Sequence, residues 1–108
     1  MFQGSIAMVE TRKLAAILAA DIAGFSRLTG ADEDRTLARI RTLRSGLIEP
    51  TVVAHNGRLV KWTGDGALVE FNSVVHAVQC AVEIQKAMIV RNADQLLDDR
   101  IEFRIGIH

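Results

Sequence analysis

Residues 14–21 read LAAILAAD, and this segment decides the fold. Seven consecutive apolar residues stop abruptly at an aspartate, which is typical of a strand buried on both faces rather than of a helix. We therefore expect a strand over Leu14 to Ala20 that delivers Asp21 at its end. The run is far shorter than the roughly 20 residues that cross a bilayer, so it predicts no membrane segment.

The next segment predicts an amphipathic helix. Gly24 and Gly30 bracket a short stretch, after which the acidic run at 32–34 marks a helix start, because negative charge is favourable at a helix N-terminus. Pro50 should kink this helix, and Asn56-Gly57 should end it. Apolar residues recur at helical spacing, whereas the arginines fall on other faces: Leu37, Ile40, Leu43, Leu47, Ile48 and Val52 against Arg39, Arg41 and Arg44.

The second half of the chain predicts a hairpin, a helix and a last strand. The strand candidates 58–63 and 67–71 flank Gly64-Asp65-Gly66, which places Asp65 at the hairpin tip. Ser73 is a plausible helix cap, a polar loop covers 91–100, and residues 101–107 alternate as in a strand. We predict that the helix buries Val74, Val78, Ala81, Val82, Ile84, Met88 and Ile89. The order strand, helix, strand, strand, helix, strand is that of an α+β, ferredoxin-like βαββαβ core.

Composition limits the remaining choices. The chain has 108 residues, of which 49% are apolar, which suits a single domain. Thirteen basic and thirteen acidic side chains cancel, so no large field is available to bind nucleic acid or an anionic membrane. The single cysteine, Cys80, excludes an internal disulfide and favours a cytoplasmic protein. We interpret residues 1–7 as a remnant of a protease-cleavable tag, so that Met8 is a candidate native start and residues 8–108 form the domain.

Two aspartates are the candidate chemical groups. Asp21 ends a strand and precedes a small-residue turn whose amides are suited to phosphate. Asp65 lies between two glycines at the predicted hairpin tip, and the two carboxylates meet if the first strand lies beside the hairpin. Paired carboxylates near free amides suit magnesium and a triphosphate, because hard cations take oxygen ligands and keep positions open for substrate. Each feature alone also has a plainer interpretation, as a helix cap or a turn.

Three segments carry a family resemblance: AADIAGFS (19–26), KWTGDG (61–66) and FRIGIH (103–108). In this order they resemble successive signatures of class III nucleotide cyclases, over about residues 12–108. The resemblance covers the first part of a family catalytic domain and implies a cyclase core truncated after its fourth strand. It also implies a phosphorus-oxygen lyase that converts ATP to cyclic AMP and pyrophosphate in intracellular signalling.

By that resemblance, Asp21, Asp65 and the carbonyl of Ile22 would hold two Mg²⁺ or Mn²⁺ ions. One ion would activate the ribose 3′-hydroxyl and the other would neutralise the leaving pyrophosphate. The amides of Gly24, Phe25 and Ser26 would face the triphosphate.

Lys61 matches the family position that reads the purine, where lysine goes with adenine. Active sites would be shared between the subunits of a homodimer. The family domain continues past its third signature with further purine-reading and transition-state residues, so we expect this chain alone to be inactive.

Two rival functions stay open. One is a noncatalytic cyclase-like module for dimerisation or nucleotide sensing. The other is a diguanylate cyclase, which shares the core but has a glycine-glycine-acidic hairpin that residues 63–66 do not match. Trp62 is larger than expected at its position and is interpreted as a core or dimer contact. We assign no site role to His55, His76, His108 or Cys80, which lack metal-ligand spacing or fit a buried position.

Overall fold

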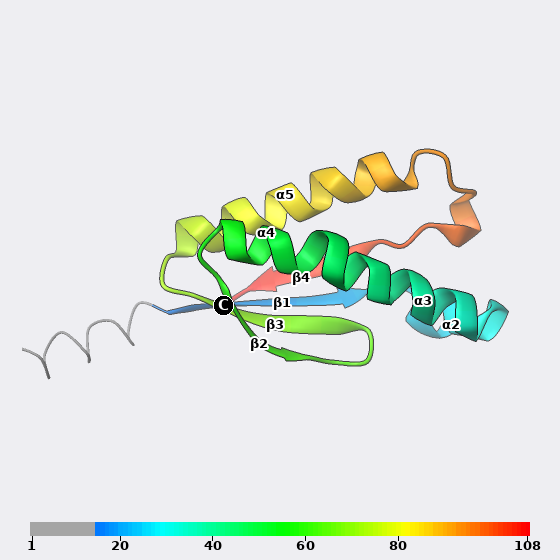
Figure 1. Ribbon diagram of the computed structural model, residues 1–108, viewed down its shortest axis with the longest axis horizontal. Helices are drawn as coiled ribbons and strands as arrows, with labels where there is room; N and C mark the ends of the chain where they lie inside the picture. Colours follow the sequence, from blue (N-terminus) through cyan, green and yellow to red (C-terminus); the bar gives the residue numbers. More distant parts are fainter. Residues whose placement is uncertain (1–14) are drawn as a thin grey trace, which may run out of the picture.

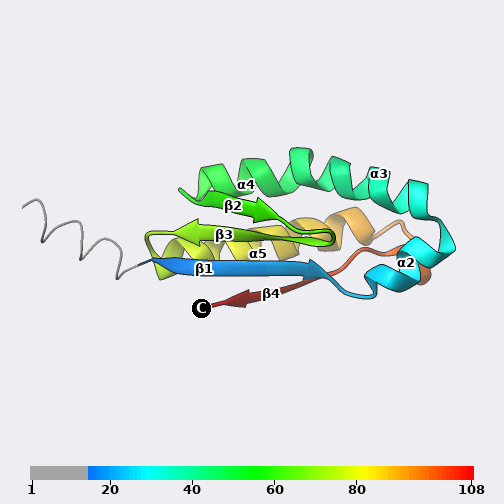
Figure 2. The same ribbon diagram turned by 90° about the horizontal axis from the view of Figure 1, so that it is seen from below.

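The chain forms a four-stranded antiparallel sheet with α3, α4 and α5 on one face, while α2 lies beyond the end of β1 (Figure 1). The computed structural model describes residues 15–108, so the predicted tag remnant and Leu14 lie outside the described residues. The sheet order β2-β3-β1-β4 confirms the ferredoxin-like topology (Figure 2). The elements are β1 (Ala16–Ile22), α2 (Phe25–Ala31), α3 (Glu33–Leu43), a π-helical segment (Arg44–Ile48), α4 (Glu49–Ala54), β2 (Arg58–Trp62), β3 (Gly66–Phe71), α5 (Val74–Asn92), a 3-10 turn (Leu97–Asp99) and β4 (Phe103–Ile107).

Strand β1 is buried on one face only, which corrects the prediction of burial on both. Leu18 and Ile22 are 1% and 2% exposed beneath the helices, whereas Ile17 and Ala19 on the opposite face are half-buried. The apolar run is continuous because both faces carry apolar side chains, but the helices cover just one of them. The strand also extends further than predicted and includes Asp21. We call the side of the sheet that the helices leave uncovered the open face.

Helix α3 begins as predicted and is interrupted before Pro50, but α2 (Phe25–Ala31) precedes it, in the segment between Gly24 and Gly30 for which no helix was predicted. The Asp32 side chain caps α3 by accepting a hydrogen bond from the Arg35 amide at 3.0 Å. Instead of a simple proline kink, residues 44–48 form a π-helical turn in which the Glu49 amide donates to the Arg44 carbonyl. Pro50 then lies in the first turn of α4, where a missing backbone donor costs least.

Helix α5 is capped by Ser73 as predicted, and Ile84 and Met88 are buried as predicted, but the buried stripe is narrower than predicted and runs through Ala77 and Cys80. Its core residues are Ala77, Cys80, Ile84, Met88 and Asn92. The exposed fractions of Val74, Val78, Val82 and Ile89 lie between 46% and 70%, so their predicted burial is wrong. Apolar residues occur around most of this helix, and the sheet covers a single stripe that includes the small residues Ala77 and Cys80.

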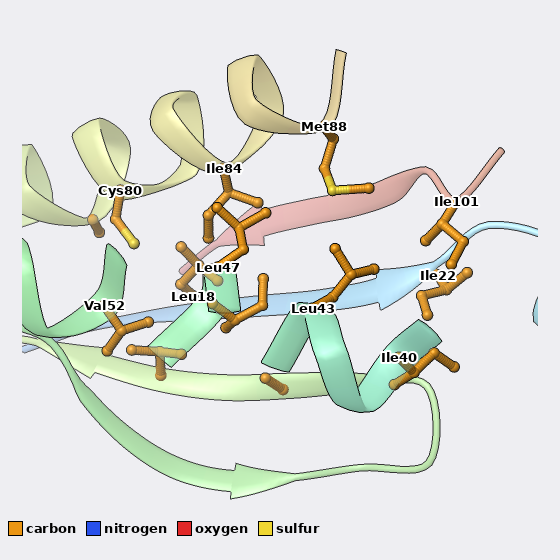
Figure 3. Close-up of a cluster of buried hydrophobic side chains, with 14 of the residues drawn as sticks. Leu18, Ile22, Ile40, Leu43, Leu47, Val52, Cys80, Ile84, Met88 and Ile101 are labelled. Atoms are coloured by element: carbon orange, nitrogen blue, oxygen red, sulfur yellow. The ribbon is translucent and has the colours of Figure 1, made fainter. Parts of the chain in front are cut away.

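The core lies between the helices and the covered face of the sheet (Figure 3). Leu18 and Ile22 of β1 pack there with Leu43 of α3 and Ile84 of α5. At its far end the amide side chain of Asn92 bonds both backbone groups of Ile101, at 2.8 Å and 3.2 Å. No helix within residues 15–108 is long and apolar enough to cross a membrane.

Candidate functional site

The candidate site lies on the open face, where β1 ends between its two neighbours. Asp21 stands opposite Gly66 of β3 and opposite Arg104 of β4 in the strand register. Leu18 and Ile22 alternate with it toward the core, so Asp21 points to the open face. Its side chain remains 44% exposed. The fold thus anchors this carboxylate on a central strand and leaves it accessible.

The hairpin tip brings Asp65 to the same place. A hydrogen bond of 2.9 Å from the Thr63 amide to the Gly66 carbonyl closes a tight loop whose two central residues are Gly64 and Asp65. The Ile22 amide donates to the Asp65 carbonyl at 3.0 Å. The two aspartates that are 44 positions apart in the sequence (65 minus 21) therefore converge.

Glycines make this close approach sterically feasible. A Cβ atom at Gly66 would lie 1.8 Å from the Ala20 carbonyl oxygen, so no side chain fits where β3 meets β1. Gly24, the N-cap residue before α2, has a φ of +68°, a conformation that residues with a Cβ rarely adopt. The sequence therefore needs glycine on both sides of the carboxylate pair.

Arg104 is a site residue that the sequence analysis missed. Its Nε donates to Oδ1 of Asp21 at 2.8 Å. This hydrogen bond and the charge of Asp21 raise the pKa of Arg104, and the charge of Asp65 adds to the effect. Both carboxylates thus act on one guanidinium. The signal was the alternation of Phe103, Ile105 and Ile107, which puts Arg104 on the opposite face of β4.

The turn after β1 presents backbone groups beside the carboxylates. The Ala23 amide donates to the Glu102 carbonyl at 2.8 Å, and α2 begins two residues later, at Phe25. Gly24 offers no side-chain cap, and the first amides of a helix have no intrahelical acceptor. Within residues 15–108, no hydrogen bond joins the Asp65 amide to the Ile22 carbonyl. The amides of Phe25 and Ser26 and this carbonyl are therefore available to a ligand.

Lys61 lies on the open face but on an edge strand. It is exposed and pairs with Leu68, while a register shift between Leu59 and Lys61 places a bulge at Val60. No hydrogen bond or ion pair within residues 15–108 joins Lys61 to Asp21 or Asp65. The structure therefore brings the aspartates together and leaves Lys61 separate.

Two nucleotide cyclases are similar to this chain, one in sequence and one in both sequence and structure. The chain is 47% identical over 97 residues to "Putative adenylate cyclase 3" of Rhizobium meliloti (strain 1021), which covers 90% of the chain. A crystal structure of an adenylate/guanylate cyclase/hydrolase from Silicibacter pomeroyi matches 86% of the chain with 46% identity and a TM-score of 0.79. This chain has the sequence and fold of a class III nucleotide cyclase domain.

The cyclase match covers only part of each relative. The chain spans 16% of the Rhizobium protein and 54% of the Silicibacter chain. It is also 31% identical over 105 residues to the serine/threonine-protein kinase pkn2 of Myxococcus xanthus, where it spans 12% of the length. No protein-family model matches the chain.

The donor atoms of this cyclase domain fit a hard divalent cation. Asp21, Asp65 and the Ile22 carbonyl offer oxygen ligands only, which Mg²⁺ and Mn²⁺ prefer. Residues 15–108 contain no cluster of three or more His, Cys, Asp or Glu side chains that would form a complete protein cage. A site with few protein ligands suits an ion that also binds water and substrate phosphates.

Proposed function

We propose that the protein containing this domain is an adenylate cyclase, which forms cyclic AMP and pyrophosphate from ATP in cytoplasmic signalling. The observation that carries this proposal is the convergence of Asp21 and Asp65 at the open end of β1. Two carboxylates held beside free backbone amides are suited to a metal-bound triphosphate. The similarity to nucleotide cyclases supports the reaction class, and Lys61 supports adenine.

The chain's own residues would bind and orient the substrate. Asp21, Asp65 and the Ile22 carbonyl would hold two Mg²⁺ or Mn²⁺ ions, which supply Lewis acidity to phosphate and hydroxyl oxygens. The amides of Gly24, Phe25 and Ser26 would donate hydrogen bonds to phosphate oxygens at the start of α2. The exposed guanidinium of Arg104 would remain beside the carboxylates as a further cation for the triphosphate.

Base selection would take place across an interface. An ammonium group donates to adenine N1 but faces a donor at the same position of guanine, so Lys61 favours ATP. Its separation from Asp21 and Asp65 supports a homodimer in which one subunit binds the phosphates and the other reads the base. Its exposure on the open face leaves it accessible to a second copy.

The proposal is tested by titrating the chain with Mn²⁺ and a nonhydrolysable ATP analogue. The double variant Asp21→Ala, Asp65→Ala should lose Mn²⁺-dependent binding. Glu70→Ala is the matched control, because Glu70 is a carboxylate of the same face that pairs with Arg58 at 2.6 Å, toward the other end of the hairpin. Equal affinity in the wild type and the double variant would reject the metal assignment.

Turnover separates the enzyme from a noncatalytic nucleotide-sensing module. The intact protein should form cyclic AMP from ATP with Mn²⁺. The chain alone should be slower by roughly a thousandfold, because the family's transition-state residues follow the third signature, and a preorganised cation at the transition state is commonly worth several kcal/mol. Nucleotide binding without cyclic AMP formation by the intact protein would favour the sensing module instead.

A further inference from the structure

Arg44 is a charged residue in the middle of a buried helical stripe. It begins the π-helical segment, and its neighbours Leu43, Leu47 and Ile48 are all buried. Sequence periodicity placed it on a polar face of the helix. In the structure its side chain is instead half-buried and directed at the β2–β3 hairpin.

The guanidinium of Arg44 makes three contacts with the last residues before Asp65. Its Nη2 donates to the Thr63 carbonyl at 2.7 Å and lies 3.5 Å from the Gly64 carbonyl. Its Cζ stands 4.7 Å from the centre of the Trp62 ring, within the range of a cation–π contact. One planar group therefore contacts three successive residues of the hairpin.

The hairpin tip needs a restraint at this point. Gly64 has no side chain to pack, and a Cβ built on it would meet nothing within 4 Å. Its carbonyl belongs to the peptide unit that carries the Asp65 amide, so the orientation of that unit affects where the Asp65 carboxylate lies. The turn bond at Thr63 and the Ile22 bond fix the two sides of the loop. Arg44 adds a contact from the helical layer.

We propose that Arg44 is a positioning residue that holds Asp65 in its metal-binding orientation through the Thr63 and Gly64 carbonyls. This inference rests on the proposed function, because it assumes that Asp65 binds a divalent cation. Lysine does not reproduce these contacts, since an ammonium has no planar face to lie on the Trp62 ring while a nitrogen at its edge donates to the Thr63 and Gly64 carbonyls.

The experiment compares Mn²⁺ binding by the full chain in two arginine-to-lysine variants. Arg44→Lys should weaken Mn²⁺ binding about tenfold, as is typical when a group supporting a metal ligand is lost. Arg58→Lys is the matched control, because Arg58 lies in the same hairpin, its ion pair with Glu70 is exposed, and its charge is likewise kept. That variant should bind Mn²⁺ as the wild type does.

A second readout separates a local effect from a loss of folding, because Mn²⁺ broadens the NMR signals of nearby amides. In the wild type, broadening should reach Gly24 and Gly66, which flank the carboxylate pair. In Arg44→Lys the same broadening should require about tenfold more Mn²⁺, while the amide signals of Ile84 and Met88 in the core keep their wild-type positions. Adding Gly64→Ala, which stiffens the backbone without a clash, should restore part of the affinity. A general loss of stability would instead shift the core amide signals from their folded positions, would not be rescued, and would contradict the positioning role.

The outcomes separate this inference from the proposed function. If the wild type binds no Mn²⁺, or binds it as well as Asp21→Ala, Asp65→Ala, the metal assignment fails and the role of Arg44 falls with it. If only the double variant loses Mn²⁺ and Arg44→Lys binds normally, the cyclase proposal stands and Arg44 is merely structural. Should Arg44→Lys not fold, Arg44→Met keeps an apolar stem in the buried stripe and removes the donors to the Thr63 and Gly64 carbonyls. Unchanged Mn²⁺ affinity in that variant would overturn the inference.

Discussion

The two faces of the sheet use the same strands for different purposes. On the covered face, Leu18 and Ile22 of β1 are nearly inaccessible and pack under the helices. On the open face, the alternate residue Asp21 is 44% exposed and paired with Arg104. The chain therefore separates stability from chemistry residue by residue along a single strand. Substitutions on the covered face should therefore lower the free energy of unfolding, whereas substitutions of the charged residues on the open face should change metal or nucleotide binding.

The largest expected effect is on the covered face. Leu18→Ala should lower the free energy of unfolding by about 2 to 5 kcal/mol, because it leaves a cavity in the core. The adjacent Ile17→Ala, on the half-buried open face, should cost only about 1 kcal/mol. Urea denaturation of both variants measures the difference, and similar losses would show that the open face is as well packed as the covered one.

A smaller effect, on function rather than folding, is expected at Lys61. Lys61→Glu should reduce the preference of the intact protein for ATP over GTP by roughly tenfold to a hundredfold, since an unmatched hydrogen bond costs about 1 to 3 kcal/mol. The free energy of unfolding should hardly change, because the side chain is exposed. Cyclic nucleotide formation from each substrate is the measurement. An unchanged preference would remove Lys61 from base recognition.

The smallest effect concerns Cys80 on the covered side. Burial, with a contribution from Glu83, raises the pKa of this thiol from 9.0 to about 11. The folded state holds the proton more tightly, so stability from this group is present below pH 9.0 and is lost as the pH rises toward 11. Iodoacetamide should modify Cys80 far more slowly in the folded chain than in urea. In Cys80→Ala this component of the pH dependence should disappear, and rapid alkylation of the folded chain would contradict the burial.

The sequence was sufficient for the order of the elements because each carried a local signal. The apolar run before Asp21, the glycines around Asp65 and the cap at Ser73 depend on neighbours in the sequence. The buried face of α5 was predicted correctly at Ile84 and Met88 but wrongly at its valines, because valines occur on several faces of the helix and only tertiary packing selects the stripe through Ala77 and Cys80. The π-helical turn before Pro50 likewise has no local signature that periodicity detects.

The part of the candidate site that depends on strand order was predictable from the sequence. The convergence of Asp21 and Asp65 follows once β1 is placed beside the hairpin. Finding Arg104 required the pairing of β4 with β1, which the ferredoxin-like order implies, and the alternation in β4, which puts Arg104 on the face opposite Phe103. Regular helical spacing puts Arg44 on a polar face, but the π-helical turn at 44–48 changes that spacing, and the carbonyls of the hairpin hold the side chain in a half-buried position.

The bulge in β2 has a consequence for insertions and deletions. Lys61 and Trp62 pair with Leu68 and Ala67, and Leu59 pairs with Val69, so Val60 is the extra residue. Deleting one residue from a regular strand turns every later side chain to the opposite face. Losing Val60 would instead leave Leu59 and Trp62 on the covered face and Lys61 on the open one, at the expense of the local twist. Strand length can therefore vary at this position without exchanging the two faces.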